Sequence, residues 1–311
     1  MQVNDLVFKE LIKRGYSLEG NTRVWNISES KLLYITPEQA KTYLDMTKSV
    51  EYQKSVVDKE VGIINENMKE IEKAVGTKPF NLIDLGCGDG KKAVIFLEHF
   101  KKNKIRYCAV DISDFMVKKA FERLDEMNLN EMVEFQWNIS DFDNIENISG
   151  LLRSGVYKNH VILLLGNTVG NFEFNELLYG VRSAMKAGDL LIIGNGLDNK
   201  DVDKIIKTYS NEPSFNFFFG LVSQLGLKKE DLDYSVRFRN SRMESYFTLK
   251  KDIKISFLDK TIYFTKGDQI ITGISYKYRK DEFSSFIRLY FHDVKIFTSD
   301  DNSYAVALCK K

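Results

Sequence analysis

The stretch Asn81-Leu-Ile-Asp-Leu-Gly-Cys-Gly-Asp-Gly90, followed by Tyr107-Cys-Ala-Val-Asp111, decides the fold of this chain. The apolar residues among 82–85 predict a buried strand, and the glycines after them let the backbone turn tightly and approach a ligand closely. A helix and a second strand over 105–110 are expected next, and that strand delivers Asp111 at its end. A carboxylate in this place can accept hydrogen bonds from both hydroxyls of a ribose. The stretch therefore predicts a nucleoside-binding βαβ unit.

The residues around the glycines favour S-adenosylmethionine (SAM) over a dinucleotide. A dinucleotide fingerprint that starts at Gly86 needs a glycine at position 91, where this chain has Lys91, so the helix cannot begin flush against a pyrophosphate. Asp84 would repel a phosphate, whereas the amino-acid end of SAM carries an ammonium and a sulfonium. A glycine-rich turn without a ligand is the alternative, and the joint presence of loop, helix and second acidic strand end disfavours it. We therefore expect SAM as the cofactor.

Length, charge and cysteine usage bound the class of protein. The chain has 311 residues, of which 43% are hydrophobic, and a formal net charge of +1. The length and the hydrophobic fraction suit one large or two modest domains. The near-zero net charge does not indicate binding to nucleic acid or to an anionic membrane. The three cysteines and three histidines lack ligand-like spacing, so we expect neither a disulfide framework nor a metal site.

The chain shows no signal for export or for a membrane. Its N-terminus lacks the charged and apolar regions of a signal peptide. No apolar run reaches the roughly 18 residues that a membrane-spanning helix needs. We therefore expect a cytoplasmic protein without a nucleic-acid or membrane partner, and the sequence leaves its oligomeric state open.

Alternating strands and helices continue after the βαβ unit. Further strands are expected over 132–137, 161–165 and 190–193, with a helix over 174–186 between the last two. All-apolar strands of this kind are typical of a parallel sheet that is buried on both faces. The pattern changes after about residue 197, where a helical stretch over 201–228 precedes strands that favour antiparallel hairpins.

The last elements, a helix over 281–290 and strands over 294–298 and 304–309, are typical of an antiparallel edge of the same sheet. We therefore expect a Rossmann-like α/β fold with a second, α+β domain. The predicted SAM-binding domain comprises residues 61–197 and 279–311. The predicted second domain comprises residues 1–60 and 198–278, and we expect it to form a lid that binds the substrate.

The loop Gly166-Asn-Thr-Val-Gly-Asn-Phe172 follows the strand predicted over 161–165. In an open α/β sheet, ligands bind beyond the carboxyl ends of the strands. The two glycines of the loop allow close backbone approach, and the amide of Asn171 could hold a substrate carboxylate. An asparagine that caps the following helix is an equally good explanation.

This loop resembles the G-[ST]-T-[IV]-G-N-[FL] signature of the histidine-specific Nα-methyltransferase family, whose members include the enzyme that makes trimethylhistidine for ergothioneine. Gly86-x-Gly88 with Lys92 is similar to the family's G-S-G-T-S-x-K loop, and Asp141-Phe142 is similar to its adenine-contacting D-F pair. Further similar segments are Val110-Asp-Ile-Ser113, Thr47-x-x-x-Glu51-Tyr52 and Thr272-x-Ile-Ser275-Tyr-Lys-Tyr278. The resemblance covers most of the chain and implies a class I SAM-dependent methyltransferase.

The resemblance also implies roles for single residues. The residues that would hold SAM are Gly86, Gly88, Lys92, Asp111, Asp141 and Phe142. The residues that would bind an amino-acid substrate are Tyr52, Gly166, Asn171, Tyr209, Gly273 and Ser275. Tyr34 and Tyr52 would be catalytic, because a tyrosine-lined site can favour the neutral amine. Taken alone, each tyrosine is better explained as a packed core aromatic, since the chain has 15 Tyr and 22 Phe.

Two departures from the family pattern concern the substrate. The family's T-E-[IV]-S has a glutamate that pairs with the imidazole of histidine, and this chain has Gly273 there. The family's F-N-x-N becomes Phe215-Asn-Phe-Phe218. A glycine cannot hydrogen-bond a ring N–H, and we expect it to enlarge the pocket. The expected substrate is therefore the amine of an amino acid or amino-acid-derived small molecule other than histidine.

Two other functions remain as alternatives. One is a methyltransferase for a protein, a peptide or RNA, which the near-zero net charge disfavours for RNA. The other is a non-catalytic SAM-binding protein, which would not need the full set of matched residues in both sites.

Overall fold

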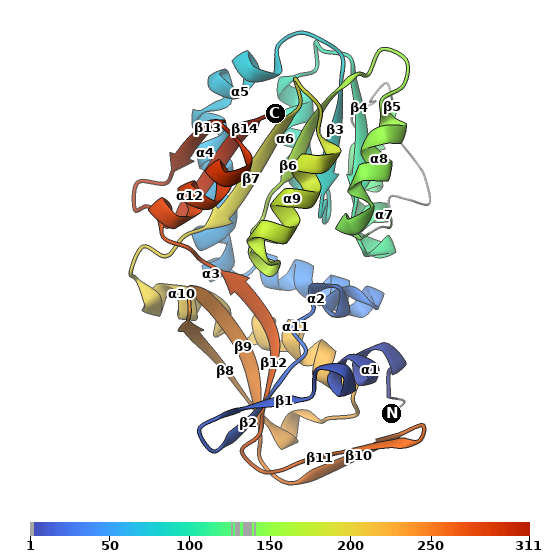
Figure 1. Cartoon of the computed structure of the whole chain (residues 1–311), viewed down its shortest axis with the longest axis vertical. Helices are drawn as coiled ribbons and strands as arrows, with labels where there is room; N and C mark the ends of the chain where they lie inside the picture. The colour runs from blue at the N-terminus through green and yellow to red at the C-terminus, as the bar shows by residue number, and fades with distance from the viewer. Residues whose placement is uncertain (1–2, 126, 128–130, 133–138, 140) are drawn as a thin grey trace. The chain divides into compact units, whose positions relative to one another are not determined.

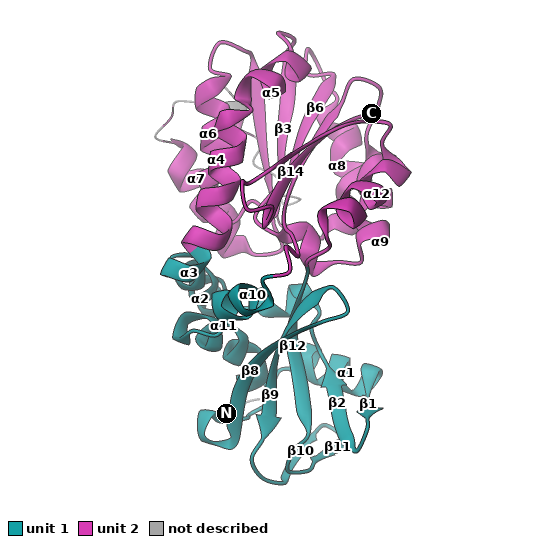
Figure 2. Ribbon diagram, turned by 90° about the vertical axis from the view of Figure 1, so that its left-hand side faces the viewer, with its two compact units in different colours: residues 1–52, 201–276 teal, residues 53–200, 277–311 magenta. Residues whose placement is uncertain are grey.

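The computed structural model (Figure 1) describes residues 3–125, 127, 131–132, 139 and 141–311. The chain divides into two compact units, shown in Figure 2: unit 1 comprises residues 1–52 and 201–276, and unit 2 comprises residues 53–200 and 277–311. The predicted boundary after residue 60 lies eight residues further along than the division after Tyr52. Among the described residues, no helix has the length and apolar character that crossing a membrane requires.

Unit 2 contains a seven-stranded sheet in the order β13-β14-β7-β6-β3-β4-β5. Its strands are β3 (Phe80–Leu85), β4 (Ile105–Val110), β5 (Glu131–Met132), β6 (Asn159–Leu164), β7 (Leu190–Gly196), β13 (Asp293–Thr298) and β14 (Tyr304–Lys310). β3 to β7 pair in parallel, and β14 pairs antiparallel with both β7 and β13. The predicted Rossmann-like α/β fold with an antiparallel edge is confirmed. Residues 133–137 of the strand predicted over 132–137 lie outside the described residues.

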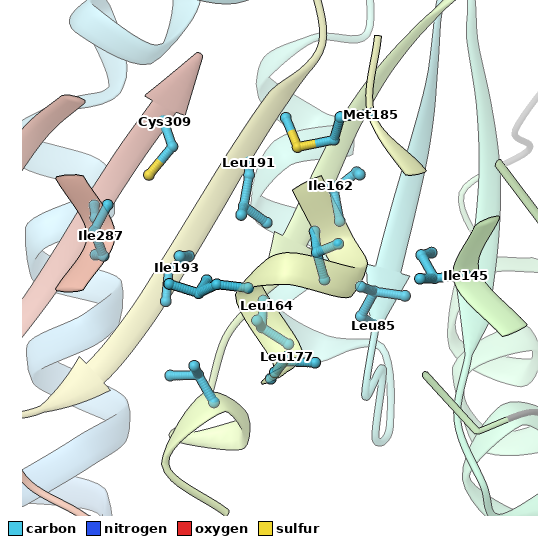
Figure 3. Close-up of a cluster of buried hydrophobic side chains, with 14 of the residues drawn as sticks. Leu85, Ile145, Ile162, Leu164, Leu177, Met185, Leu191, Ile193, Ile287 and Cys309 are labelled. Carbon is cyan, nitrogen blue, oxygen red and sulfur yellow. The ribbon is translucent and has the colours of Figure 1, made fainter. Parts of the chain in front are cut away.

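Helices cover both faces of this sheet (Figure 2). They are α4 (Asp58–Glu66), α5 (Met68–Val75), α6 (Lys91–His99) and α7 (Asp114–Asp125) on one face, and α8 (Ile145–Leu152), α9 (Phe174–Ala184) and α12 (Lys280–Tyr290) on the other. Figure 3 shows the core under the second group, where Leu85, Ile162, Leu164, Leu191 and Ile193 of the strands meet Leu177 and Ile287 of the helices. This burial fixes the carboxyl ends of β3, β4, β6 and β7, where ligands bind in folds of this kind.

Unit 1 contains a five-stranded sheet in the order β1-β2-β12-β9-β8 and a separate β10-β11 hairpin. Its strands are β1 (Tyr16–Glu19), β2 (Thr22–Asn26), β8 (Leu232–Arg239), β9 (Arg242–Leu249), β10 (Ile253–Phe257), β11 (Lys260–Phe264) and β12 (Gln269–Tyr276). Its helices are α1 (Asp5–Arg14), α2 (Pro37–Thr47), α3 (Val50–Tyr52), α10 (Val202–Tyr209) and α11 (Glu212–Ser223). β2 pairs in parallel with β12, so the N-terminal segment is part of the same sheet as the residues inserted after β7.

The single helical stretch predicted over 201–228 is two helices, α10 and α11. The break lies at Asn211, whose side chain accepts a hydrogen bond from the Ser214 N–H as the N-cap of α11. Pro213 follows in the first turn, where the absence of an N–H costs nothing. The periodic apolar residues on both sides concealed this capping signal.

Candidate active site

The glycine loop between β3 and α6 adopts a conformation that other residues rarely take. Gly86, Gly88 and Gly90 all have positive φ, of 71°, 52° and 73°. A Cβ atom at Gly86 would lie 3.1 Å from the side chain of Thr168 and 3.6 Å from the ring of Phe142. The predicted glycine loop therefore lies against both the predicted adenine pair and the predicted substrate loop.

Asp111 stands at the end of β4 and binds the glycine loop directly. Its Oδ2 accepts a hydrogen bond from the Gly88 N–H at 3.1 Å, and its Oδ1 accepts one from the Ser113 N–H at 3.0 Å. Burial raises the pKa of Asp111 to about 6, although these backbone hydrogen bonds act to lower it. Each carboxylate oxygen can accept a further hydrogen bond, as the predicted ribose contact requires.

The predicted adenine pair is held near the loop 166–172. Asp141 accepts a hydrogen bond through Oδ1 from the Phe142 N–H at 2.7 Å, so the two groups predicted to contact adenine are bonded to each other. The ring of Phe142 packs against that of Phe172, with 5.2 Å between ring centroids. The segment predicted to contact adenine and the loop predicted to bind the substrate are thus joined by an aromatic contact.

Lys92, on the first turn of α6, reaches the first residue of the substrate loop. A Cβ atom at Gly166 would lie 2.5 Å from Lys92 Nζ, so a side chain at this position would displace the ammonium from where it lies. Lys92 forms an ion pair with Glu60, a fully buried residue of α4. Sequence reasoning missed Glu60, although a signal existed: it lies three residues after Val57 and four before Ile64, a spacing that puts it on the same face of α4 as these apolar residues.

Asn171 does not cap the helix that follows it. The N-cap residue of α9 is Glu173, so the capping explanation is wrong. Asn171 instead ends a 3-10 turn, Thr168–Asn171, and is half-buried. Its assignment to a substrate carboxylate remains a prediction.

The loop 166–172, predicted to bind the substrate, is fixed to the sheet by Asn167, another residue that sequence reasoning missed. Asn167 has a φ of 65° and accepts, through Oδ1, a hydrogen bond of 2.6 Å from the N–H of Gly196 at the end of β7. Its buried Nδ2 has no hydrogen-bond partner within the part of the chain that the structure describes.

Lys277 is a buried lysine at the same edge of the sheet, and it too was missed. A Cβ atom at Gly196 would lie 3.2 Å from its Nζ. Burial lowers the pKa of Lys277 to about 7. A lysine that titrates near neutral pH therefore lies at the carboxyl end of β7.

In unit 1, the predicted tyrosines lie in aromatic clusters. Tyr52 and Tyr209 are both buried and meet edge to face, with 6.1 Å between ring centroids. Tyr34 contacts the rings of Tyr43 and Phe217, at 5.4 and 5.8 Å. Packing of this kind agrees with the explanation of each as a core aromatic, and the catalytic roles of Tyr34 and Tyr52 remain predictions.

Gly273 lies at a β-bulge of β12, where the register against β9 shifts between Ile271 and Gly273. A Cβ atom there would overlap the ring of Phe218 and lie 2.9 Å from its Cδ1. The space that the glycine leaves is therefore filled by Phe218, and the expectation that Gly273 enlarges the pocket does not hold at this position. Ser275, two residues further along β12, is buried.

The carboxyl groups near the glycine loop of unit 2 fit a ligand with two positive charges. Glu60, Asp84 and Asp111 supply three carboxyl groups, and Lys92 supplies one ammonium. Asp84 accepts a hydrogen bond from the Tyr107 hydroxyl at 3.1 Å, and burial raises its pKa to about 7. The charges of Lys92, Asp111 and Glu60 all act on the Asp84 carboxyl. A cationic ligand would stabilise the ionised forms of these acids, which fits the ammonium and sulfonium of SAM.

Comparisons with known proteins find methyltransferases that are similar to this chain. Residues 29–311 match the profile of a family described as "Histidine-specific methyltransferase, SAM-dependent". A histidine N-alpha-methyltransferase of Mycobacterium tuberculosis is 21% identical over 78% of this chain and 79% of its own length. N-methyltransferase fsqC of Aspergillus fumigatus is 23% identical over 72% of this chain and 64% of its own length. A solved SAM-dependent methyltransferase of Clostridium acetobutylicum aligns with a TM-score of 0.42 at 11% identity, over 80% of this chain and 90% of its own.

Proposed function

Because the chain belongs to the family of histidine-specific, SAM-dependent methyltransferases, we propose that it methylates the amine of an amino acid, or of an amino-acid-derived small molecule, other than histidine. The chain is a SAM-dependent methyltransferase and SAM is its cofactor. The relatives' names support transfer to nitrogen, since they are called histidine N-alpha-methyltransferase and N-methyltransferase.

The observation that carries the choice of substrate is the pair Gly273 and Phe218. Where the family resemblance places a carboxylate for the imidazole, this chain has a glycine whose side-chain space is taken by an aromatic ring. A buried imidazole N–H without an acceptor costs about 1–3 kcal/mol. Histidine would then lose roughly ten- to hundredfold against a substrate of similar size with an apolar end. The substrate is therefore an amine whose side chain ends in an apolar or aromatic group.

The roles of the chain's own residues follow from the chemistry of amine methylation. Bound SAM supplies a methyl carbon activated by a sulfonium. An amino-acid ammonium must lose its proton before its nitrogen can attack, and desolvation near tyrosine rings favours the neutral amine. We assign this task to Tyr34 and Tyr52. As the family resemblance implies, Asn171, Tyr52 and Tyr209 are each assigned to the carboxylate or the amine of an amino-acid substrate, whose nitrogen must be aligned with the methyl carbon.

A turnover screen tests this proposal. S-adenosylhomocysteine release would be followed with each of the twenty amino acids and with common derivatives. We expect release with an apolar or aromatic amino acid or derivative, and release with histidine that is roughly ten- to hundredfold slower or absent. Turnover with histidine at a comparable rate would contradict the substrate assignment. If no compound leads to S-adenosylhomocysteine release although the protein binds SAM tightly, the result would favour a peptide substrate or a protein that binds SAM without using it.

A further inference from the structure

We propose that Glu60 is a positioning residue that holds the cofactor lysine, Lys92, and the start of the substrate loop, Gly166, in one fixed arrangement. No comparison assigns a role to Glu60, and the proposal rests on SAM binding alone, so it does not depend on which amine is the substrate.

The carboxylate of Glu60 is fully buried and makes contacts to three different parts of unit 2. Its Oε1 accepts hydrogen bonds from the Gly166 N–H at 2.8 Å and from the Tyr304 hydroxyl at 2.7 Å. Its Oε2 faces the Lys92 ammonium in the ion pair. One side chain therefore connects the substrate loop, the first turn of α6 and strand β14.

The backbone around Glu60 leaves space for this carboxylate. A Cβ atom at Gly194, in the middle of β7, would overlap Glu60 Oε1 and lie 2.9 Å from its Cδ. Gly194 has no positive φ that would demand a glycine. The position of the carboxylate therefore explains why no side chain stands at this point of a buried strand.

The ion pair leaves Lys92 able to bind a ligand. An ammonium has three N–H donors, and the ion pair with Glu60 uses one of them. The Lys92 side chain is 23% exposed, so part of it faces away from the buried carboxylate. A lysine has several rotatable bonds, and ordering them on binding is costly. Glu60 orders Lys92 beforehand, so the ligand meets an ammonium that is already in place.

The first experiment is calorimetric titration of SAM into the full-length protein and into Glu60→Gln, without any methyl acceptor. Glutamine can still accept from Gly166 and Tyr304, but it cannot pair with an ammonium. We expect SAM affinity to fall about tenfold. The matched control is Asp301→Asn, which removes the ion pair of the neighbouring residue Lys59 and should leave SAM affinity unchanged.

A double-mutant cycle separates positioning from general stability. If Glu60 acts through Lys92, then Glu60→Gln should weaken SAM binding no further in a Lys92→Met background. A full tenfold loss in that background, or unchanged or tighter SAM binding in Glu60→Gln alone, would overturn the proposal. A lower melting temperature with unchanged SAM affinity would likewise show a merely structural role.

Tyr304→Phe keeps the test usable if Glu60→Gln does not fold. This variant removes one of the two hydrogen bonds to Oε1 and leaves the ion pair chemically intact. We expect a smaller loss of SAM affinity, about threefold, that disappears in the Lys92→Met background. Equal SAM affinity in Tyr304→Phe and the unchanged protein would then count against positioning. Because no acceptor amine is present, these outcomes are independent of the substrate screen.

Discussion

At the scale of single residues, Gly273 and Phe218 behave as a compensating pair. The Phe218 ring occupies the space where a Cβ atom at position 273 would lie. The ring in turn packs against Phe217 and Tyr234. A change at either position alone therefore leaves an overlap or a gap. The sequence revealed both substitutions, but it could not reveal that they lie against each other, since they are distant in the chain.

This pairing predicts the outcome of restoring the family residues. Gly273→Glu alone should lower the unfolding free energy by about 1–3 kcal/mol, because its side chain overlaps the Phe218 ring, with little gain for histidine. The double variant Gly273→Glu with Phe218→Asn should recover stability and raise kcat/KM for histidine about tenfold or more over Gly273→Glu. Thermal unfolding and turnover with histidine measure the two effects. Equal behaviour of the single and double variants would show that the two positions are not coupled.

A second residue-scale prediction separates the cofactor residues from the substrate residues. Asp111→Ala should weaken SAM binding about tenfold or more, because the carboxylate that is predicted to accept two ribose hydroxyls is lost. Asn171→Ala should abolish turnover and leave SAM affinity largely intact. Titration calorimetry with SAM and turnover with the substrate found in the screen measure both. An unchanged SAM affinity in Asp111→Ala would refute the ribose assignment, and equal loss of both properties in Asn171→Ala would refute the substrate assignment.

The buried acids predict how SAM binding depends on pH. Burial raises the folded-state pKa values of Asp84 and Asp111 to about 7 and about 6. The stability that the two protonated side chains contribute is therefore fully present below about pH 4, and it is lost as the pH rises through the folded-state pKa values. A cationic ligand favours the ionised acids, and SAM affinity should therefore rise between pH 5 and pH 8. Asp84→Asn should flatten the part of this rise near pH 7. An affinity independent of pH in the unchanged protein would contradict the charge complementarity described for this site.

At the scale of elements, continuous apolar runs predicted the strands of unit 2 well. β4 has the predicted bounds, and β6 lies within two residues of its predicted bounds at each end, since its apolar run is buried on both faces of the sheet. Two features of the helices were not predicted: the break between α10 and α11, and the burial of Glu60. In both cases a single polar residue lies within a periodic apolar pattern, and the pattern alone predicts an uninterrupted helix. Asn167 was also missed, since its hydrogen bond to Gly196 joins residues that are close only in the folded chain.

The contact between the substrate loop and β7 gives an element-scale prediction. Asn167→Ala would leave the buried N–H of Gly196 without its acceptor, and the unfolding free energy should fall by about 1–3 kcal/mol. Denaturant titration measures this change. The matched control is Asn199→Ala, which removes an exposed hydrogen bond to the Asp301 carbonyl and should cost less than about 0.5 kcal/mol. An equal cost for both variants would show that Asn167 does not anchor the loop.

At the scale of the whole molecule, the change of pattern after residue 197 predicted a second group of elements. The predicted limits at 198 and 278 lie within a few residues of the divisions at 201 and 276. The N-terminal limit is further off, because the π-helical turn Gln53–Val57 and α4 follow Tyr52 without a loop. A continuous helical pattern carries no mark of the point where the chain passes from one unit to the other.

The pairing of β2 with β12 has a consequence for the synthesis of the protein. Val24 pairs with Gln269, and β14, the last strand, lies between β7 and β13 in the other sheet. At about 5–20 residues per second, a ribosome needs roughly 12–50 seconds between these partners. The sheet of unit 1 cannot be completed before β12 has left the exit tunnel of the ribosome, and the sheet of unit 2 cannot be completed before β14 has left it. Both sheets are therefore completed only after β12 and β14 have been synthesised, and a stop codon before β12 would leave both sheets unfinished.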